Sequence, residues 1–239
     1  MSQYLPYHKS LPYTYVLGIF PTFEVLSHRP DDVIAIIYHA DFDNLGGLKA
    51  RTDGLHIPLL QDHKLLAKLS PKENVYVVAV LEKKNYPIQT GNHVMLVNPS
   101  NAGNLGTIIR TMVGFGWRDL VIIRPGVEVE DPKTIRAAMG ANAQLRVSYY
   151  DTFEQYRTDY PTQVCYPFML KGSMPLQSMV LAGQRGITFI FGNEGSGLPD
   201  DFLRVGTPVK IAHSDAIDSL NLSIAVSIAL YHHSLAADL

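Results

Sequence analysis

Residues 93–123 constrain the fold of this chain most, because they read as two buried strands joined by a helix. Residues 94–97 form an apolar run of strand length, and a loop rich in Asn, Gly, Pro and Ser follows. Apolar residues recur at helical spacing over residues 108–115, and Gly116 stands where glycine commonly ends a helix. A second apolar run covers residues 120–123. This order predicts a crossover unit, and hence an α/β fold with a parallel sheet.

The loop over residues 98–106 is the first candidate ligand site. Loops at the carboxyl ends of parallel strands bind ligands in open α/β folds, because helix N-termini and free backbone amides meet there. The loop holds three asparagines, and Arg110 follows one to two turns into the helix. Such an arginine is either part of a site or on an exposed helix face, and this segment alone favours neither. The glycines match neither a dinucleotide fingerprint nor a phosphate loop, which disfavours a nucleotide-dependent oxidoreductase.

Composition sets broad limits on the class of protein. The 239 residues, 46% of them hydrophobic and 18% charged, suit one large or two small globular domains. A formal net charge of −2 counts mildly against nucleic-acid binding, although a local basic patch is compatible with it. The single cysteine, the polar start and the lack of long apolar runs predict a cytoplasmic protein without a membrane span. With nine scattered histidines and no cysteine cluster, we expect no metal site.

The N-terminal part reads as a small α/β domain. Residues 33–38 and 75–81 are apolar runs of strand length, and helix-like segments alternate with them. The polar stretch 82–92 contains Pro and Gly, so it is a candidate linker or, equally, an internal loop. We therefore expect two domains, residues 1–88 and residues 89–239.

Two later segments also carry functional signals. The loop 192–201 follows an apolar run, and its glycines allow a close approach of the backbone to a ligand. Glu194 lies among them, and taken alone it suits a turn with a solvent-facing acid better than a site. Residues 209–234 read as a strand, a polar loop and a helix with small residues between its apolar positions. This helix is either a buried core helix or part of a subunit interface.

Three separated stretches together resemble the three motifs of the SpoU, or TrmH-type, family of SPOUT RNA methyltransferases. They are NAGNLGTIIRTMVGFG (101–116), FIFGNEGSGLPDD (189–201) and VKIAHSDAIDSLNLSIA (209–225). They occur in the family's order and near its spacing, and the resemblance covers essentially the whole second domain. It implies a parallel sheet whose C-terminal segment forms a trefoil knot. The N-terminal part resembles, more loosely, the ribosomal-protein-like substrate-binding domain often fused in front of that fold.

The resemblance implies an enzyme that uses S-adenosylmethionine to methylate a ribose 2′-hydroxyl of RNA, on guanosine or another nucleoside. It also implies a homodimer, and the N-terminal domain favours ribosomal over transfer RNA as the partner. The family's motif positions carry over to these candidate catalytic residues: Asn104, Arg110, Glu194, Ser219 and Asn221. The candidate cofactor-binding residues are Leu170, Lys171, Gly172, Phe191, Gly192, Asn193, Glu194, Gly195, Ile211, Ala212, Ser219, Leu220 and Asn221.

The resemblance also suggests roles for these residues. Arg110 suits stabilisation of negative charge better than proton abstraction, because an arginine pKa above about 12 makes a neutral guanidinium costly at pH 7. Asn104 and Glu194 are expected to orient Arg110 or the ribose. Candidate RNA-contacting cations are Lys49, Arg51, Lys64, Lys68, Arg118, Arg124, Lys133 and Arg136.

One departure from the family pattern supports an alternative function. The family usually has proline after the strand of its third motif, whereas residues 212–215 read Ala-His-Ser-Asp. This change affects the expected cofactor pocket. The alternative is an RNA-binding or ribosome-assembly protein that keeps the fold without methyl transfer.

Overall fold

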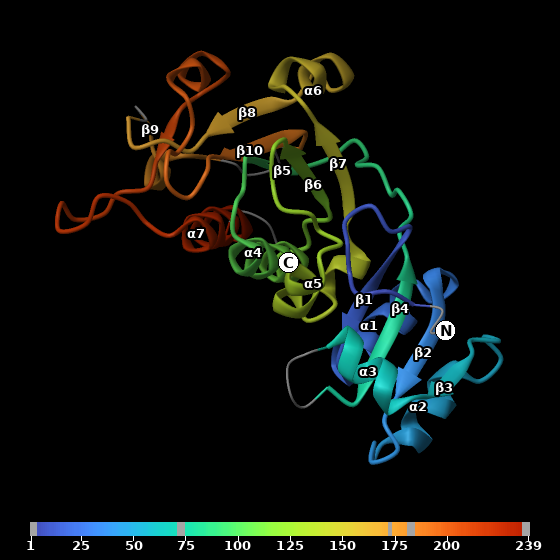
Figure 1. Cartoon of the computed structure of the whole chain (residues 1–239). Coiled ribbons are helices and arrows are strands. Elements are labelled where there is room, and N and C mark those ends of the chain that lie inside the picture. Colours follow the sequence, from blue (N-terminus) through green and yellow to red (C-terminus); the bar gives the residue numbers. More distant parts are fainter. Residues whose placement is uncertain (1–3, 71–74, 172–173, 181–184, 236–239) are drawn as a thin grey trace. The chain divides into compact units, whose positions relative to one another are not determined.

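The computed structural model describes residues 4–70, 75–171, 174–180 and 185–235 (Figure 1). The chain packs as two compact units. Unit 1 contains Met1–Asn85 and Glu128–Gln144, and unit 2 contains Tyr86–Val127 and Leu145–Leu239. The sequence-based division had grouped residues 128–144 with the second domain, whereas in the structure they pack within unit 1.

Unit 1 is built on a four-stranded sheet in the order β1-β4-β2-β3. β4 runs antiparallel to both β1 and β2, and β3 runs parallel to β2. Its strands are β1 (Tyr13–Leu17), β2 (Val33–Tyr38), β3 (Leu59–Gln61) and β4 (Val77–Glu82). Its helices are α1 (Ile19–His28), α2 (Leu45–Thr52), α3 (His63–Leu69) and α5 (Pro132–Ala138), with 3₁₀ turns η1 (Pro30–Asp32) and η2 (Ala141–Gln144).

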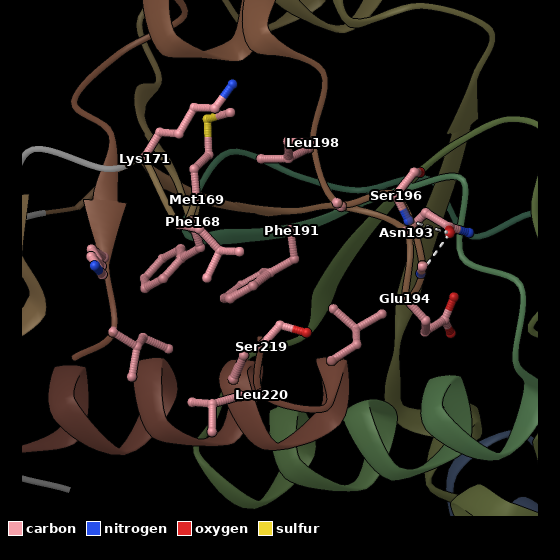
Figure 2. A pocket seen from close by; sticks show the side chains of 18 of the residues that line it. Phe168, Met169, Lys171, Phe191, Asn193, Glu194, Ser196, Leu198, Ser219 and Leu220 are labelled. Atoms are coloured by element: carbon pink, nitrogen blue, oxygen red, sulfur yellow. Dashed lines mark hydrogen bonds between the residues drawn. The ribbon is translucent and has the colours of Figure 1, made fainter. Parts of the chain in front are cut away.

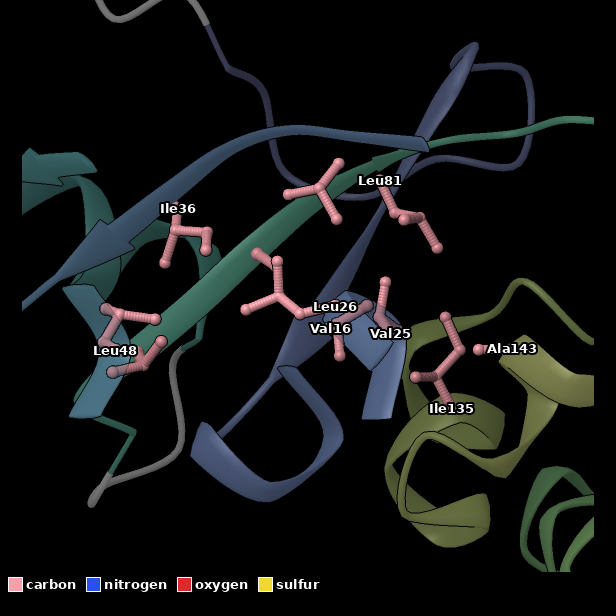
Figure 3. Packing of buried hydrophobic residues seen from close by; sticks show 11 residues of the cluster. Val16, Val25, Leu26, Ile36, Leu48, Leu81, Ile135 and Ala143 are labelled. Atoms are coloured by element: carbon pink, nitrogen blue, oxygen red, sulfur yellow. The ribbon is translucent and has the colours of Figure 1, made fainter. Parts of the chain in front are cut away.

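The core of unit 1 explains why residues 128–144 belong to it. Ile135 of α5 and Ala143 of η2 are buried in the same cluster as Val16 and Val25 (Figure 3). Gly140 lies between α5 and η2 with φ +84°, and a Cβ there would stand 2.8 Å from backbone atoms of Pro21. The apolar residues of this insertion are therefore removed from water by the core of unit 1.

Unit 2 contains a five-stranded sheet in the order β7-β6-β5-β10-β8, in which every pairing is parallel. Its strands are β5 (His93–Val97), β6 (Asp119–Ile123), β7 (Arg146–Tyr150), β8 (Val164–Pro167) and β10 (Ile187–Phe191). A small pair is formed by β9 (Met174–Pro175) and β11 (Val209–Lys210). The helices are α4 (Ala102–Gly114), α6 (Phe153–Asp159) and α7 (Leu222–Ser234), with η3 (Leu176–Ser178) and η4 (Asp200–Arg204). The predicted α/β fold with a parallel sheet is confirmed, and β5, α4 and β6 form the predicted crossover unit.

Helix α4 begins and packs as its sequence dictates. The Asn101 side chain accepts hydrogen bonds from the backbone amides of Gly103 and Asn104, at 2.8 and 3.0 Å, and so caps the helix. Its apolar positions are buried: Leu105, Ile108, Ile109 and Met112. Helix α7 packs against α4, where the Thr111 and Ser227 hydroxyls lie 3.3 Å apart (Figure 1). Arg110 lies on the exposed face of α4.

A buried hydrogen-bonded histidine lies at the start of β5. The Nε2 atom of His93 is 2.7 Å from the carbonyl oxygen of Gln89, and its Nδ1 atom is 2.8 Å from the Tyr156 hydroxyl. The Tyr156 hydroxyl in turn lies 2.6 Å from that of Thr188. A neutral ring satisfies both contacts of His93, with Nε2 donating and Nδ1 accepting. Burial lowers the pKa of His93 below its ordinary value, although the bond to Gln89 acts in the opposite direction.

We predict that His93 makes the protein less stable in mild acid. Because the pKa of His93 is lower in the folded than in the unfolded chain, its contribution is complete above about pH 6.5 and is lost as the pH falls towards the folded pKa. Urea unfolding of wild type and His93→Gln at pH 8, 7, 6 and 5 measures this. The variant should be less stable at pH 8 and should lose less stability on acidification. His8→Gln, at an exposed position, is the control, and parallel pH profiles of wild type and His93→Gln would contradict the prediction.

The described residues contain neither a candidate membrane span nor a candidate metal site. None of the helices in the described part of the chain is both long and apolar enough to span a membrane. Within the same described ranges, no three His, Cys, Asp or Glu side chains gather closely enough to hold a metal ion.

Candidate functional site

A cavity of about 330 Å³ opens in unit 2 at the carboxyl ends of β8 and β10 (Figure 2). Figure 2 shows Met169, Lys171 and Leu198 on one side of it and Ser219 and Leu220 on the other. Ten of the predicted cofactor-binding residues line it: Leu170, Lys171, Phe191, Gly192, Asn193, Glu194, Gly195, Ile211, Ser219 and Leu220. These residues come from three segments that are separate in the sequence, and their proposed role in cofactor binding stays a prediction.

Three predicted cofactor-binding residues fall outside this lining. Ala212 is exposed and does not line the cavity, whereas its neighbour His213 does. Asn221 caps α7 and directly follows Ser219 and Leu220 in the sequence, but it does not line the cavity itself. Gly172 lies outside the described residues.

Sequence reasoning missed several residues of the cavity. Phe168 stacks on Phe191, with ring centroids 4.4 Å apart and planes at 14°. Each of these rings stands at the end of a parallel strand, which is the signal that pointed to a ligand site elsewhere in the chain. The other missed residues are Met169, Ser196, Gly197, Leu198, Asp200, Lys210, His213, Leu222 and Ala225.

The loop after β10 folds back tightly on itself. A Cβ on Gly192 would stand 2.1 Å from the carbonyl carbon of Gly197, so only glycine fits. The Asn193 side-chain oxygen accepts hydrogen bonds from the amides of Gly195 and Ser196, at 2.9 and 3.2 Å. The Asn193 amide also donates to the carbonyl oxygen of Asn98, at 2.7 Å. The loop is thus held both internally and against the loop that follows β5.

The carboxylate of Glu194 binds the loop that precedes α4. Its Oε2 accepts from the amide and the hydroxyl of Ser100, at 3.0 and 2.7 Å. Its Oε1 accepts from the amide of Asn101, at 3.1 Å, and from the side-chain amide of Asn104, at 3.3 Å. Burial alone would raise the pKa of Glu194, but the hydrogen bonds from Ser100 and Asn104 hold the pKa below its ordinary value. Glu194 is therefore an engaged anion and not a solvent-facing turn residue.

Asn104 joins Glu194 to the third motif. The side-chain amide of Asn221 donates to the Asn104 side-chain oxygen, at 3.2 Å. The Asn221 oxygen accepts from the backbone amide and the hydroxyl of Ser223, at 2.9 and 2.7 Å. A continuous hydrogen-bonded series, Glu194 to Asn104 to Asn221, thus connects three stretches that are distant in the sequence.

Arg110 stands apart from this series. It follows Asn104 by six residues on α4 and is exposed, and its side chain makes no hydrogen bond or ion pair within the ranges that the structure describes. Glu194 bonds residues of the preceding loop and Asn104, and not Arg110. The Glu194 carboxylate is therefore bonded to the loop before α4, whereas the Arg110 guanidinium faces solvent.

Polar groups also line the opposite wall of the cavity. The ammonium of Lys171 lies 2.8 and 2.9 Å from the two carboxylate oxygens of Asp200. His213 bends back, so that its Nδ1 atom is 3.2 Å from the carbonyl oxygen of Ile211. In the unusual segment 212–215, His213 is the residue that reaches the cavity.

The chain is similar in sequence and in fold to several known proteins. A relative from Synechocystis, named "Uncharacterized tRNA/rRNA methyltransferase slr1673", is 29% identical over 70% of this chain, and this chain covers 64% of its length. A tRNA (cytidine(34)-2′-O)-methyltransferase from Methylovorus glucosotrophus is 28% identical over 58% of this chain and 90% of its own. A solved AdoMet-bound rRNA methyltransferase from Sinorhizobium meliloti superposes with a TM-score of 0.81 at 22% identity, covering 95% of this chain and 89% of its own.

The family comparison covers the same region as the site. The model of the SpoU rRNA Methylase family matches residues 91–231, which include all three motif stretches and most of unit 2. Because this match spans more than half of the chain, the chain belongs to the SpoU rRNA methylase family.

Proposed function

We propose that this chain is an S-adenosylmethionine-dependent methyltransferase that methylates a ribose 2′-hydroxyl of RNA. The observation that carries the proposal is the hydrogen-bonded series from Glu194 through Asn104 to Asn221, which brings the three motif stretches together beside one cavity. Membership of the SpoU family supports an RNA methyltransferase of this kind. The names of the relatives support 2′-O-methylation, and the base that carries the ribose stays open.

The cavity fits the proposed cofactor in size and chemistry. Small-molecule sites typically measure about 300–1,000 Å³ and combine apolar walls with a few polar groups. Here the Phe168 and Phe191 rings supply an apolar wall, and the lining also includes the polar residues Lys171, Glu194, Asp200 and Ser219. When bound, S-adenosylmethionine would supply an electrophilic methyl group on a positively charged sulfur.

The proposal includes the family's knot in the C-terminal segment. β11 pairs with β9, whereas α7 packs against α4, so residues 211–221 must cross from one place to the other. They do so beside the loop 192–197, with which they share the cavity. This crossing is the feature that supports a knotted path.

The proposed roles of the chain's residues follow from the charge that develops in the reaction. As the ribose oxygen attacks the methyl carbon, a carbon–oxygen bond forms, the carbon–sulfur bond breaks, and the hydroxyl proton leaves. Arg110 would stabilise the negative charge on that oxygen, since its guanidinium is exposed and has no partner among the described residues. It would remain protonated throughout, and the proton would pass to water or to a neighbouring group. Asn104, fixed by Glu194 and Asn221, would position the start of α4.

We propose that unit 1 contributes to RNA binding and that ribosomal RNA is the substrate. The tRNA-modifying relative from Methylovorus aligns over 142 residues, which is too few to include both units of this chain. An additional unit suits a large folded substrate. Methyl-transfer assays with purified ribosomal and transfer RNA compare the two substrates directly, and modification of transfer RNA alone would reverse this assignment.

The central test is calorimetric titration with S-adenosylmethionine, followed by transfer of a radiolabelled methyl group to RNA. Micromolar binding at about one site per chain, with label in RNA that resists alkaline cleavage at the modified position, is the expected result. If a folded protein shows no binding up to millimolar cofactor, the non-catalytic RNA-binding alternative is favoured. The segment 212–215 would then be the first place to seek the cause.

We predict that Asn221→Ala weakens cofactor binding. The substitution removes the cap of α7 and the bond to Asn104, and Ser219 and Leu220, which line the cavity, directly precede it. Loss of a cap costs about 0.5–2 kcal/mol, and a similar loss in binding would raise the dissociation constant by roughly two- to thirtyfold. Titration calorimetry measures this, with Ser234→Ala near the end of α7 as the control. An unchanged dissociation constant would show that Asn221 does not support cofactor binding.

We propose a homodimer in which α7 contributes to the interface. Ile224 and Tyr231 are 49% and 56% exposed, and because they are seven residues apart they share one face of α7. We predict that the double variant Ile224→Glu, Tyr231→Glu is monomeric by light scattering after gel filtration, whereas the wild type is a dimer. Val180→Glu, at another exposed apolar residue of unit 2, is the control. A double variant that remains dimeric would remove α7 from the interface.

A further inference from the structure

We propose that Arg124 and Tyr149 bind the nucleotide next to the methylated ribose, so that the RNA strand runs along the carboxyl edge of the unit 2 sheet. This inference rests on the proposed function, because it assumes that RNA is the substrate. It adds a binding surface that none of the three motif stretches contains.

The first argument is position along the sheet. The strand order β7-β6-β5-β10-β8 places the carboxyl ends of all five parallel strands on one edge. The cavity lies at the β10 and β8 end, and the loop that precedes α4 follows β5. Arg124 directly follows β6, and Tyr149 lies in β7. Since neighbouring strands are about 4.8 Å apart, these residues continue the same edge about 5–10 Å beyond the loop after β5.

The second argument is that the surface is firmly attached to the site. The amide of Arg124 donates to the carbonyl oxygen of Tyr150, at 2.9 Å, and so extends the ladder between β6 and β7. The amide of Val127 donates to the carbonyl oxygen of Pro99, at 2.9 Å. The Asn98 side chain donates to the carbonyl oxygen of Pro125, at 3.2 Å. The loops after β5 and β6 are therefore bonded to each other, and a ligand on one has a defined place relative to the other.

The third argument is the chemistry of the pair. The guanidinium carbon of Arg124 lies 5.0 Å from the centroid of the Tyr149 ring, and the side chain of Arg124 is 57% exposed. An aromatic ring beneath a guanidinium holds it flat, which leaves its outer face open to stack on a base and its N–H groups free to donate to phosphate. Asp151 approaches Arg124 to 3.9 Å, but it is 70% exposed, so this ion pair is weak.

The other cations of this edge are differently placed. Lys171 is paired with Asp200, and Lys210 lines the cavity. Arg124 is therefore an exposed cation on the far side of the loop 98–104 from the cavity. A polyanionic strand that presents its ribose at that loop would meet Arg124 next, so RNA is the occupant that this surface fits.

The test measures RNA affinity separately from methyl transfer. A fluorescein-labelled, mixed-sequence single-stranded RNA of 20 nucleotides is titrated with the full-length wild type and with four variants. The variants are Arg124→Gln, Tyr149→Ala, Tyr149→Phe and Arg204→Gln. Arg204 is the matched control, because it is also an exposed arginine of unit 2 but lies away from the carboxyl ends of the strands. The segment 205–207 that follows it contacts Cys165 near the start of β8. We expect Arg124→Gln and Tyr149→Ala to weaken binding about tenfold, and Tyr149→Phe and Arg204→Gln to change it less than twofold.

Three further readouts separate this surface from the proposed reaction. Arg124→Gln should lower the slope of log affinity against log salt by about one, because one phosphate contact is lost. Cofactor affinity should be unchanged. With an RNA that the wild type methylates, the KM of the variant should rise while its kcat stays within about twofold. If wild type binds RNA without transferring methyl, the proposed function fails but the binding comparison still tests this surface. Equal RNA affinities and salt slopes for wild type, Arg124→Gln and Arg204→Gln would overturn the inference.

Discussion

Replacing Arg110 by alanine should lower kcat for methyl transfer by about 10²–10³-fold while cofactor affinity stays within about twofold of wild type. The expected size is that of losing one group that stabilises a developing oxyanion. Cofactor binding should survive because Arg110 does not line the cavity and its side chain bonds no described residue. For the same reason, the free energy of unfolding should change by less than about 0.5 kcal/mol.

Single-turnover kinetics with saturating cofactor measure this loss without interference from product release. Arg110→Lys should recover only part of the rate, since an ammonium keeps the charge but not the planar fork of donors. Arg204→Ala removes a different exposed arginine of unit 2 and should leave the rate unchanged. If Arg110→Ala abolished cofactor binding in a folded protein, the charge-stabilising role would be wrong.

Replacing Glu194 by glutamine should disturb both stability and cofactor binding. The carboxylate accepts four hydrogen bonds, two from Ser100 and one each from Asn101 and Asn104. Glutamine keeps one acceptor oxygen and directs an amide towards the remaining donors. Because bonds to a charged group contribute about 1.5–3 kcal/mol each and part of the set survives, we expect a net loss of about 2 kcal/mol at pH 7. We also expect cofactor affinity to fall about tenfold, since Glu194 lines the cavity.

The pH dependence distinguishes the charge of Glu194 from its shape. The pKa of Glu194 is lower in the folded chain than its ordinary value of about 4.5, so its stabilisation is complete above about pH 4.5 and is lost as the pH falls through the folded pKa. The stability difference between wild type and Glu194→Gln should therefore shrink between pH 5 and pH 3. Glu154→Gln, at an exposed position of α6, should behave like wild type throughout. A difference that does not change with pH would show that the charge is not the source of the effect.

Much of unit 2 followed from local signals in the sequence. Apolar runs of strand length, helical spacing and a glycine where a helix commonly ends locate β5, α4 and β6, because strand burial and helix termination depend on residues a few positions apart. The resemblance of three short stretches to one family then gave ten of the residues that line the cavity. The roles of these residues stay predictions.

Other features depended on packing between distant residues, which no local pattern records. Residues 128–144 pack in unit 1 because Ile135 and Ala143 complete a core whose other members come from the first 81 residues of the chain. Glu194 looked like a solvent-facing acid, yet its partners lie more than 90 residues away, in the loop before α4. Phe168 and His213 line the same cavity because the loops after β8 and β11 lie beside each other in the structure. The sequence thus determined the elements and the family, whereas the tertiary structure decided which side chains meet, because those meetings join residues that are remote along the chain.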